Sequence, residues 1–254
     1  MSTFLSELNK RNSLLYLVGW ACIIGAIICA IFTQTDNTTV LGINAWIKPM
    51  KFFLSTTAFI WTMGWYMFYL NKKRAVSIYS WVIVLVLIFE LAVIVWQASN
   101  GRLSHFNISK KLYLNLFNAM GVAIVILVFW TVYITVLFFT RKGLNLPSSY
   151  LWAIRLGLIF FIIFSFEGGL MAARLSHTVG SADGGAGLPI LNWSKAYGDL
   201  RVAHFFGMHA LQLLPIAAFY LLTKTWQLII FSMLYFGFVV ILMMQALNHT
   251  PFIS

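Results

Sequence analysis

Charged residues are scarce in this sequence of 254 residues. Asp, Glu, Lys and Arg together make up 9% of it, whereas 61% of its residues are hydrophobic. A soluble domain of this size carries roughly 25% charged residues. The composition therefore excludes a soluble globular protein and indicates one that is embedded in a membrane.

Cysteine is also scarce. The two cysteines, Cys22 and Cys29, are seven residues apart in the first apolar run and so share one helix face. No other cysteine could complete a metal cluster with them. We interpret both as small apolar packing residues.

Several catalytic motifs are absent from the sequence. It contains no Walker loop, no dinucleotide-binding glycine fingerprint, no Gly-x-Ser-x-Gly elbow and no His-Glu-x-x-His zinc motif. The seventh apolar run has no lysine for a retinal Schiff base, and the histidine boxes of membrane desaturases are missing. Seven-span hydrolases that bind zinc through His-x-x-x-His are the nearest analogy, but His204 and His209 here have a wider spacing.

Seven apolar runs dominate the sequence. A helix needs about 20 apolar residues to cross the hydrocarbon core of a bilayer. The first run is too long for the apolar part of a signal peptide, so we interpret it as a retained span. The sequence predicts an all-α integral membrane protein, a single seven-helix domain over residues 1–254, with spans at 14–32, 52–70, 78–96, 112–139, 150–171, 201–222 and 226–246.

The basic residues set the expected orientation. The net charge is +11, but the cations lie in short clusters at the ends of apolar runs and not in a basic stripe, which argues against a nucleic-acid partner. Each side carries eight basic residues, but on one side every segment is short and basic, whereas on the other they are mixed with Asp36, Asp183 and Asp199 in longer loops. We therefore place the first side in the cytoplasm. The N-terminus is then cytoplasmic and the C-terminus extracytoplasmic, in a plasma membrane that we expect to be a bacterial inner membrane. These basic segments contain Lys10, Arg11, Lys72, Lys73, Arg74, Arg141, Lys142 and Lys224.

Two outer loops are longer than the cytoplasmic ones. Residues 33–51 include a Lys-Pro-Met-Lys stretch, Lys48–Lys51, that could form a short interfacial helix. Residues 176–199 are rich in glycine, which disfavours helix and is typical of a mobile lid.

Polar side chains of the predicted spans gather in the outer half of the bilayer. Such groups are costly in a membrane and normally face the bundle interior or a wet cavity. Their common depth predicts a shared cavity that opens outward. The group consists of Glu90, Gln97, Asn115, Asn118, Glu167, His204, His209, Gln212, Gln245, Asn248 and His249.

Residue type gives each candidate a role at this predicted site. Imidazole suits zinc or iron, and a bound metal could activate water or oxygen. We therefore predict metal ligation by His105, His177, His204 and His209, catalytic roles for Glu90, Glu167, Arg174 and Arg201, and substrate binding by Gln97, Asn118, Asp199 and Gln212.

Helical spacing leaves alternatives open for both glutamates. Glu90 and Gln97 share a helix face and could simply be hydrogen bonded. Glu167 and Arg174 also share a face and could form an ion pair, and His177 would extend their polar strip if the helix continues that far.

The tetrapeptide Arg-Leu-Ser-His occurs twice, at 102–105 and at 174–177. Each copy follows an apolar run that contains one glutamate, but the two glutamates do not align when the tetrapeptides do. A tandem repeat and a chance coincidence both remain open.

Several longer motifs resemble those of an uncharacterised family of bacterial multi-pass membrane proteins. They are Ser-His-Phe-Asn at 104–107, His-Thr-Val-Gly at 177–180, Asp-Gly-Gly at 183–185, and Gly-Asp-Leu-Arg-Val-Ala-His-Phe at 198–205 followed by His-Ala-Leu-Gln at 209–212. Lys-Pro-Met-Lys-Phe at 48–52 belongs to the same resemblance. It covers most of the chain and implies a membrane family, with no particular chemistry.

Four functions fit these features. The first is a metal-dependent membrane hydrolase or oxidoreductase that acts on a lipid-like or membrane-proximal substrate. The second is a transporter or proton-coupled receptor for a small molecule, which uses Glu90 and Glu167 as titrating groups. The third is a haem protein with two histidine ligands, and the fourth is a structural or assembly protein. The lipid bilayer is an expected partner in each case, and the oligomeric state is open.

Overall fold

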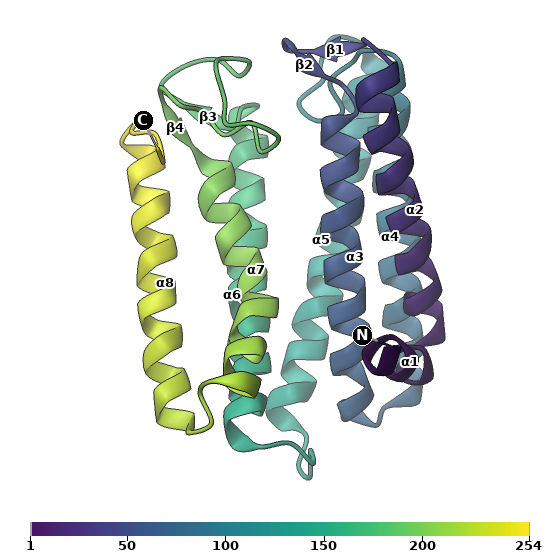
Figure 1. Ribbon diagram of the computed structural model, residues 1–254, viewed down its shortest axis with the longest axis vertical. Helices are drawn as coiled ribbons and strands as arrows, with labels where there is room; N and C mark the ends of the chain where they lie inside the picture. The colour runs from purple at the N-terminus through teal and green to yellow at the C-terminus, as the bar shows by residue number, and fades with distance from the viewer. Residues whose placement is uncertain (1, 254) are drawn as a thin grey trace. The chain divides into compact units, whose positions relative to one another are not determined.

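A computed structural model describes residues 2–253 (Figure 1). Helices dominate this part of the chain, with two short β-hairpins between them. In chain order the elements are α1 (Ser2–Arg11), α2 (Ser13–Thr35), β1 (Thr39–Val40), β2 (Ile43–Asn44), α3 (Ile47–Met67), the 3₁₀ turn η1 (Phe68–Leu70), α4 (Lys73–Ser99), α5 (Lys111–Thr140), α6 (Ser148–Arg174), β3 (Thr178–Val179), β4 (Gly198–Asp199), α7 (Leu200–Tyr220) and α8 (Thr225–Leu247).

Among residues 2–253, six helices are long and apolar enough to cross a membrane, namely α2, α4, α5, α6, α7 and α8. The prediction of a helical membrane protein is confirmed to that extent. The predicted span 52–70 falls on α3 and η1, and α3 is not among the six. The predicted interfacial helix is absent as a separate element, because Lys48–Lys51 forms the first turns of α3.

The chain forms two compact units, Met1–Ile134 (unit 1) and Thr135–Ser254 (unit 2), with their boundary inside α5. Each unit contains a helix, a β-hairpin, a central helix and a third helix. In unit 1 these are α2, β1–β2, α3 and α4, and in unit 2 they are α6, β3–β4, α7 and α8. One Arg-Leu-Ser-His copy lies just after the third helix of unit 1, and the other begins at the end of the first helix of unit 2. The two tetrapeptides are therefore not at equivalent positions in the two units.

In unit 1, α3 packs against both α2 and α4. Glycine allows a close approach to α2, because a Cβ atom at Gly19 would overlap the Trp61 ring and one at Gly25 would overlap the Phe53 ring. Such close approach through small residues is typical of helices that associate in membranes. The Trp61 indole also donates to the Tyr16 carbonyl, 3.4 Å away.

The short helix α1 was not predicted from the sequence. It docks beside α3, where Leu8 is fully buried and Asn12 donates from its amide to Ser80 Oγ at 2.8 Å. The Arg11 guanidinium lies 3.8 Å from the Trp65 ring centroid and is bonded to Glu7, an arrangement that combines cation–π attraction with an ion pair.

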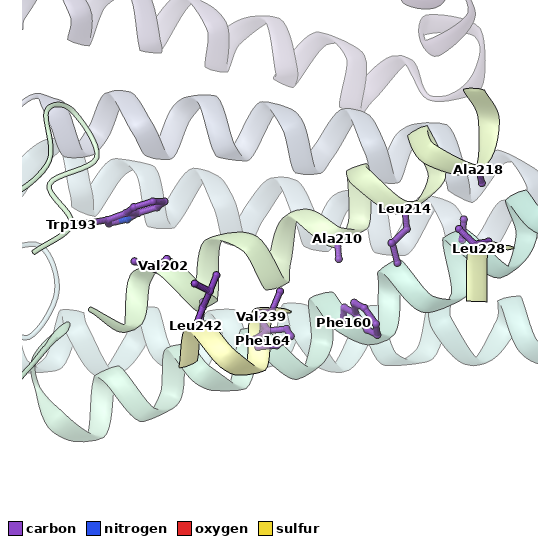
Figure 2. Packing of buried hydrophobic residues seen from close by; sticks show 12 residues of the cluster. Phe160, Phe164, Trp193, Val202, Ala210, Leu214, Ala218, Leu228, Val239 and Leu242 are labelled. Carbon is purple, nitrogen blue, oxygen red and sulfur yellow. The ribbon is translucent and has the colours of Figure 1, made fainter. Parts of the chain in front are cut away.

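In unit 2, α7 packs against both α6 and α8. The buried apolar cluster between them includes Phe160 and Phe164 of α6, Ala210 and Leu214 of α7, and Val239 of α8 (Figure 2). A Cβ atom at Gly207 would overlap the Phe164 ring, so α6 and α7 interlock at this level. This core holds the helices that carry Glu167, His204 and His209.

Candidate functional site

Glu90 and Gln97 lie seven residues apart on one buried face of α4. Their exposed fractions are 4% and 1%, and neither Oε1 atom has a hydrogen-bond partner among the described residues. The predicted hydrogen bond between them is therefore not formed through these atoms. A buried acceptor without a partner costs free energy, about 1–3 kcal/mol for a neutral group and more for a charged one.

The neighbourhood of Glu90 is mostly apolar. Val93 and Ile94 of α4 pack against Met120 of α5, with Phe52 of α3 at the edge of this cluster. The His105 ring lies 5.6 Å from the Phe52 ring, and the Ser104 hydroxyl lies 3.1 Å from His105 Nδ1. The α4–α5 contact continues toward the start of α4, where the Tyr79 hydroxyl is 2.5 Å from that of Thr131.

Glu167 is likewise buried in an apolar helix of unit 2, although α6 is the first helix of that unit and α4 is the third helix of unit 1. It lies in α6 with an exposed fraction of 5%, and both of its carboxylate oxygens are buried with no partner among residues 2–253. Arg174 is exposed, so the predicted Glu167–Arg174 ion pair is not formed. α6 ends at Arg174 because Leu175 adopts a left-handed conformation with φ of 52°, and the predicted helical strip therefore does not reach His177.

In α7, His204 and His209 each form a hydrogen bond through Nδ1 within unit 2. His204 donates from Nδ1 to the Phe164 carbonyl at 2.7 Å, so in the neutral ring the lone pair is on Nε2. His209 Nδ1 lies 3.2 Å from Oε1 of Gln212. The His204 ring is also close to Gly168, where an added Cβ would come within 3.3 Å of it. His204 is thus held beside the segment of α6 that carries Glu167.

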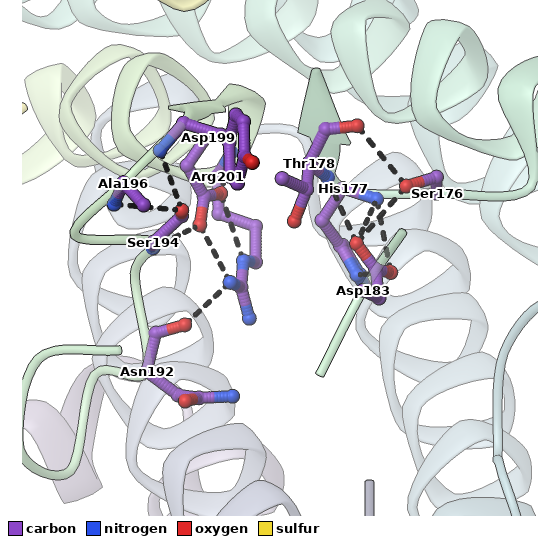
Figure 3. A network of polar contacts seen from close by, with 10 residues as sticks. Ser176, His177, Thr178, Asp183, Asn192, Ser194, Ala196, Asp199 and Arg201 are labelled. Carbon is purple, nitrogen blue, oxygen red and sulfur yellow. Dashed lines mark hydrogen bonds and ion pairs between the residues drawn. The ribbon is translucent and has the colours of Figure 1, made fainter. Parts of the chain in front are cut away.

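The loop after α6 is fastened by Asp183 (Figure 3). Its carboxylate accepts from the backbone N–H groups of His177 and Thr178, at 2.9 to 3.1 Å, and lies 2.8 Å from His177 Nδ1. Ser176 also contacts it at 3.0 Å. Burial alone would raise the pKa of the Asp183 carboxyl, but the bonds from His177 and Thr178 outweigh it and hold that pKa well below its usual range.

A second clamp closes the same loop at the start of α7. Asp199 caps α7 by accepting from Arg201 N at 3.0 Å and also binds the Arg201 guanidinium, with contacts of 2.9 and 2.5 Å. The Asp199 side chain is fully buried, and it further accepts from Ser194 N (Figure 3). With the β3–β4 pairing, these contacts fasten both ends of residues 176–199, the segment whose glycine content predicts a lid.

The Asp183 clamp gives a testable prediction. Asp183→Asn should loosen β3–β4 by about 1–3 kcal/mol, because an amide nitrogen would face hydrogen-bond donors. The expected readout is faster hydrogen–deuterium exchange at the amides of His177 and Thr178.

The sign of the pH dependence follows from the lowered pKa of Asp183. Its stabilisation is present above the ordinary pKa of an aspartate, about 3.9, and is lost as the pH falls below that value toward the lower folded-state pKa. The difference between wild type and Asp183→Asn should therefore shrink only in acid. Equal exchange at neutral pH would contradict the clamp.

The predicted metal ligands do not assemble into a recognisable centre. Across residues 2–253, no three His, Cys, Asp or Glu side chains form a group that could hold a metal ion. His177 is engaged by Asp183, and His204 by a backbone carbonyl. The zinc, iron and haem predictions stay predictions and gain no support from the donor geometry.

The predicted substrate-binding residues have different surroundings. Gln97 and Asp199 are buried, Gln212 is half-buried beside His209, and Asn118 is exposed. The contacts of Asp199 are those of a helix cap and an ion pair, which is a structural role.

No protein-family model, curated protein or solved structure matches this chain. The resemblance to an uncharacterised family of bacterial membrane proteins and the bacterial inner-membrane location therefore stay predictions.

Proposed function

We propose that this protein is a proton-coupled membrane transporter in which Glu90 and Glu167 carry the protons. The observation that supports this function is the burial of both glutamates in apolar helices, each with a carboxylate oxygen that has no partner among the described residues. A carboxylate in that setting is costly, whereas a protonated carboxyl is tolerated. Such a group releases its proton when water or a ligand reaches it.

The proposal includes seven membrane crossings, with α3 as the seventh. With 21 residues, α3 is about 31 Å long at a rise of about 1.5 Å per residue, close to the ~30 Å thickness of the hydrocarbon core. Its lower hydropathy has a physical reason, since a helix between α2 and α4 is partly shielded from lipid. The central helix of unit 2, α7, is likewise the least apolar of the six candidate spans.

The two units share an element order along the chain, in which a helix, a pair of short strands, a central helix and a third helix follow one another. Internal structural repeats are a recurring architecture of membrane transporters. The repeated order therefore supports transport over a purely structural role.

Proton coupling can be tested in proteoliposomes with a pH-sensitive dye inside. Gluconate, inorganic phosphate, glycine and glucose would be added outside in turn, at an inward proton gradient. We expect at least one of them to drive proton entry, and Glu90→Gln and Glu167→Gln each to reduce it at least about tenfold, because an amide cannot release a proton.

The third glutamate of the chain supplies a matched control. Glu7 lies in α1, is part-exposed and pairs with Arg11, so Glu7→Gln should leave proton entry unchanged. Solute-driven proton entry that persists in both Glu90→Gln and Glu167→Gln would contradict the proposal. So would the absence of proton entry with all four solutes.

A further inference from the structure

Positive charge is concentrated at the end of unit 1 that we expect to face outward, where α2 and α4 end and α3 and α5 begin. The only acidic side chains at this end are Asp36 and the buried Glu90. Asp36 already accepts from Thr38 and from the Trp46 indole, at 2.6 and 2.7 Å. Hydrogen bonds from these two side chains and from the Thr38 backbone lower the pKa of Asp36, so it is fully ionised at neutral pH. The cations at this end are Lys48, Lys51, Arg102, Lys110 and Lys111.

Two of these cations lie where a helix disfavours them. Lys48 and Lys51 belong to the first two turns of α3, at the positive end of its dipole, and no acidic residue occupies the first turn. The N-cap residue Trp46 forms no side-chain cap. Cations at a helix N-terminus are destabilising, whereas an anion there is stabilised by the dipole and the N–H groups.

Lys48 also lies against the apolar cluster of unit 1. Its ammonium is 5.9 Å from the centroid of the Phe52 ring, one turn further along α3. Phe52 in turn packs against Val93 and Ile94, which follow Glu90 by three and four residues and so share its face of α4. The Glu90 Oε1 atom, which is buried and has no partner among the described residues, therefore belongs to the helix face that Phe52 contacts.

We propose that unit 1 binds a small oxyanion, a carboxylate or a phosphate, between Lys48 and the protonated carboxyl of Glu90. Lys48 and Lys51 supply the positive charge, and the Glu90 O–H donates to an oxygen of the anion. The apolar surroundings from Phe52, Val93 and Met120 strengthen both interactions, because charges attract more strongly where water is excluded. This inference rests on the proposed function for the role of Glu90 as the proton carrier.

The site couples the anion to the proton. An ionised Glu90 would repel the anion, so the anion binds when Glu90 is protonated, and its affinity rises as the pH falls. Other titratable groups could add to this dependence. The loop after α4 contributes His105, α3 contributes Lys48 and Lys51, and the α5 residues of this cluster, Leu116 and Met120, carry no charge.

Binding can be measured apart from transport. The full chain in neutral phosphatidylcholine nanodiscs would be titrated calorimetrically with gluconate, inorganic phosphate, glycine or glucose at constant ionic strength. We expect saturable binding of gluconate, phosphate or both, with a Kd that is lower at about pH 5 than at about pH 8, because binding requires the protonated carboxyl of Glu90 and protonation of a carboxyl is favoured as the pH falls. Which anion binds distinguishes a carboxylate from a phosphate ligand.

Variants assign the roles of the residues. Lys48→Gln should weaken anion binding at least about tenfold, and Lys48→Arg much less. Lys111→Gln, at an exposed position at the start of α5, is the matched control and should change nothing. Glu90→Gln should keep anion binding but abolish its pH dependence, whereas His105→Asn should retain that dependence.

Three outcomes would overturn the inference: no saturable binding of either anion, binding of glycine or glucose alone, or equal effects of Lys48→Gln and Lys111→Gln. Failure of the proposed function gives a different result. Anion binding without solute-driven proton entry would leave the site intact and remove the transporter. Proton entry driven only by an uncharged solute, without anion binding, would support the transporter and rule out the anion site.

Discussion

Alanine at Gly207 should strongly destabilise unit 2. The added methyl group would overlap the base of the Phe164 ring, and Phe164 cannot rotate away because it is 2% exposed within the core cluster and packs on Phe236. Overpacking of this kind costs about 1–3 kcal/mol or more. We expect a clear fall in the midpoint of thermal unfolding in detergent, followed by circular dichroism.

Gly169→Ala supplies the matched control, in the helix that packs against Gly207. Gly169 lies inside α6, and an added Cβ would have no neighbour within 4 Å. Alanine there should be neutral or stabilise the helix by up to about 1 kcal/mol, because it has the higher helix propensity. Equal midpoints for Gly207→Ala and wild type would mean that α6 and α7 do not interlock at Phe164.

Asp199→Ala should have the largest effect of any polar substitution in unit 2. It removes the cap of α7 and leaves the Arg201 guanidinium without its carboxylate, in a place where the Asp199 side chain is fully buried. Breaking one side of a buried ion pair costs about 3–5 kcal/mol. Chemical denaturation of the purified protein, followed by tryptophan fluorescence, would measure the loss.

Two companion variants separate the parts of this effect. Asp199→Asn keeps one oxygen, which can accept from either the Arg201 or the Ser194 backbone N–H group but not from both, and it loses the charge. It should therefore be destabilised less than Asp199→Ala. Asp36→Ala, at the half-exposed aspartate after α2, should cost less than either. A loss for Asp199→Ala no larger than that for Asp36→Ala would show that the clamp contributes little.

The sequence predicts the helices well because a bilayer imposes a simple rule. Uninterrupted apolar length is required wherever lipid surrounds a helix, and six of the seven predicted spans coincide with helices that meet this requirement. The span at 52–70 falls on α3, which is not among those six helices and packs against α2 and α4. The helix α1 was not predicted because it is short, polar on one side and packed against Trp65, which is distant in sequence.

The candidate site was predictable only in part. Glutamates inside apolar runs mark Glu90 and Glu167 directly, since charge at such positions is costly. That Glu167 has no partner among the described residues could not be predicted, because the polar strip expected beyond it depends on where α6 ends. The left-handed Leu175 ends that helix and turns His177 toward Asp183, and neither residue type signals this in advance. Lys48 belongs to a motif of the sequence, but the position of its ammonium near the Phe52 ring is known only from the structure.

Every residue of unit 1 precedes every residue of unit 2 along the chain. During synthesis the first unit can therefore complete its internal contacts while the second is still being made, as is general for domains formed in N- to C-terminal order. Of the helices, only α5 contributes residues to both units, and most of α5 belongs to unit 1. Unit 2 would therefore begin to form from the last residues of a helix that is already part of unit 1. A nascent chain that stops between α5 and α6 should accordingly contain a protected, folded first half.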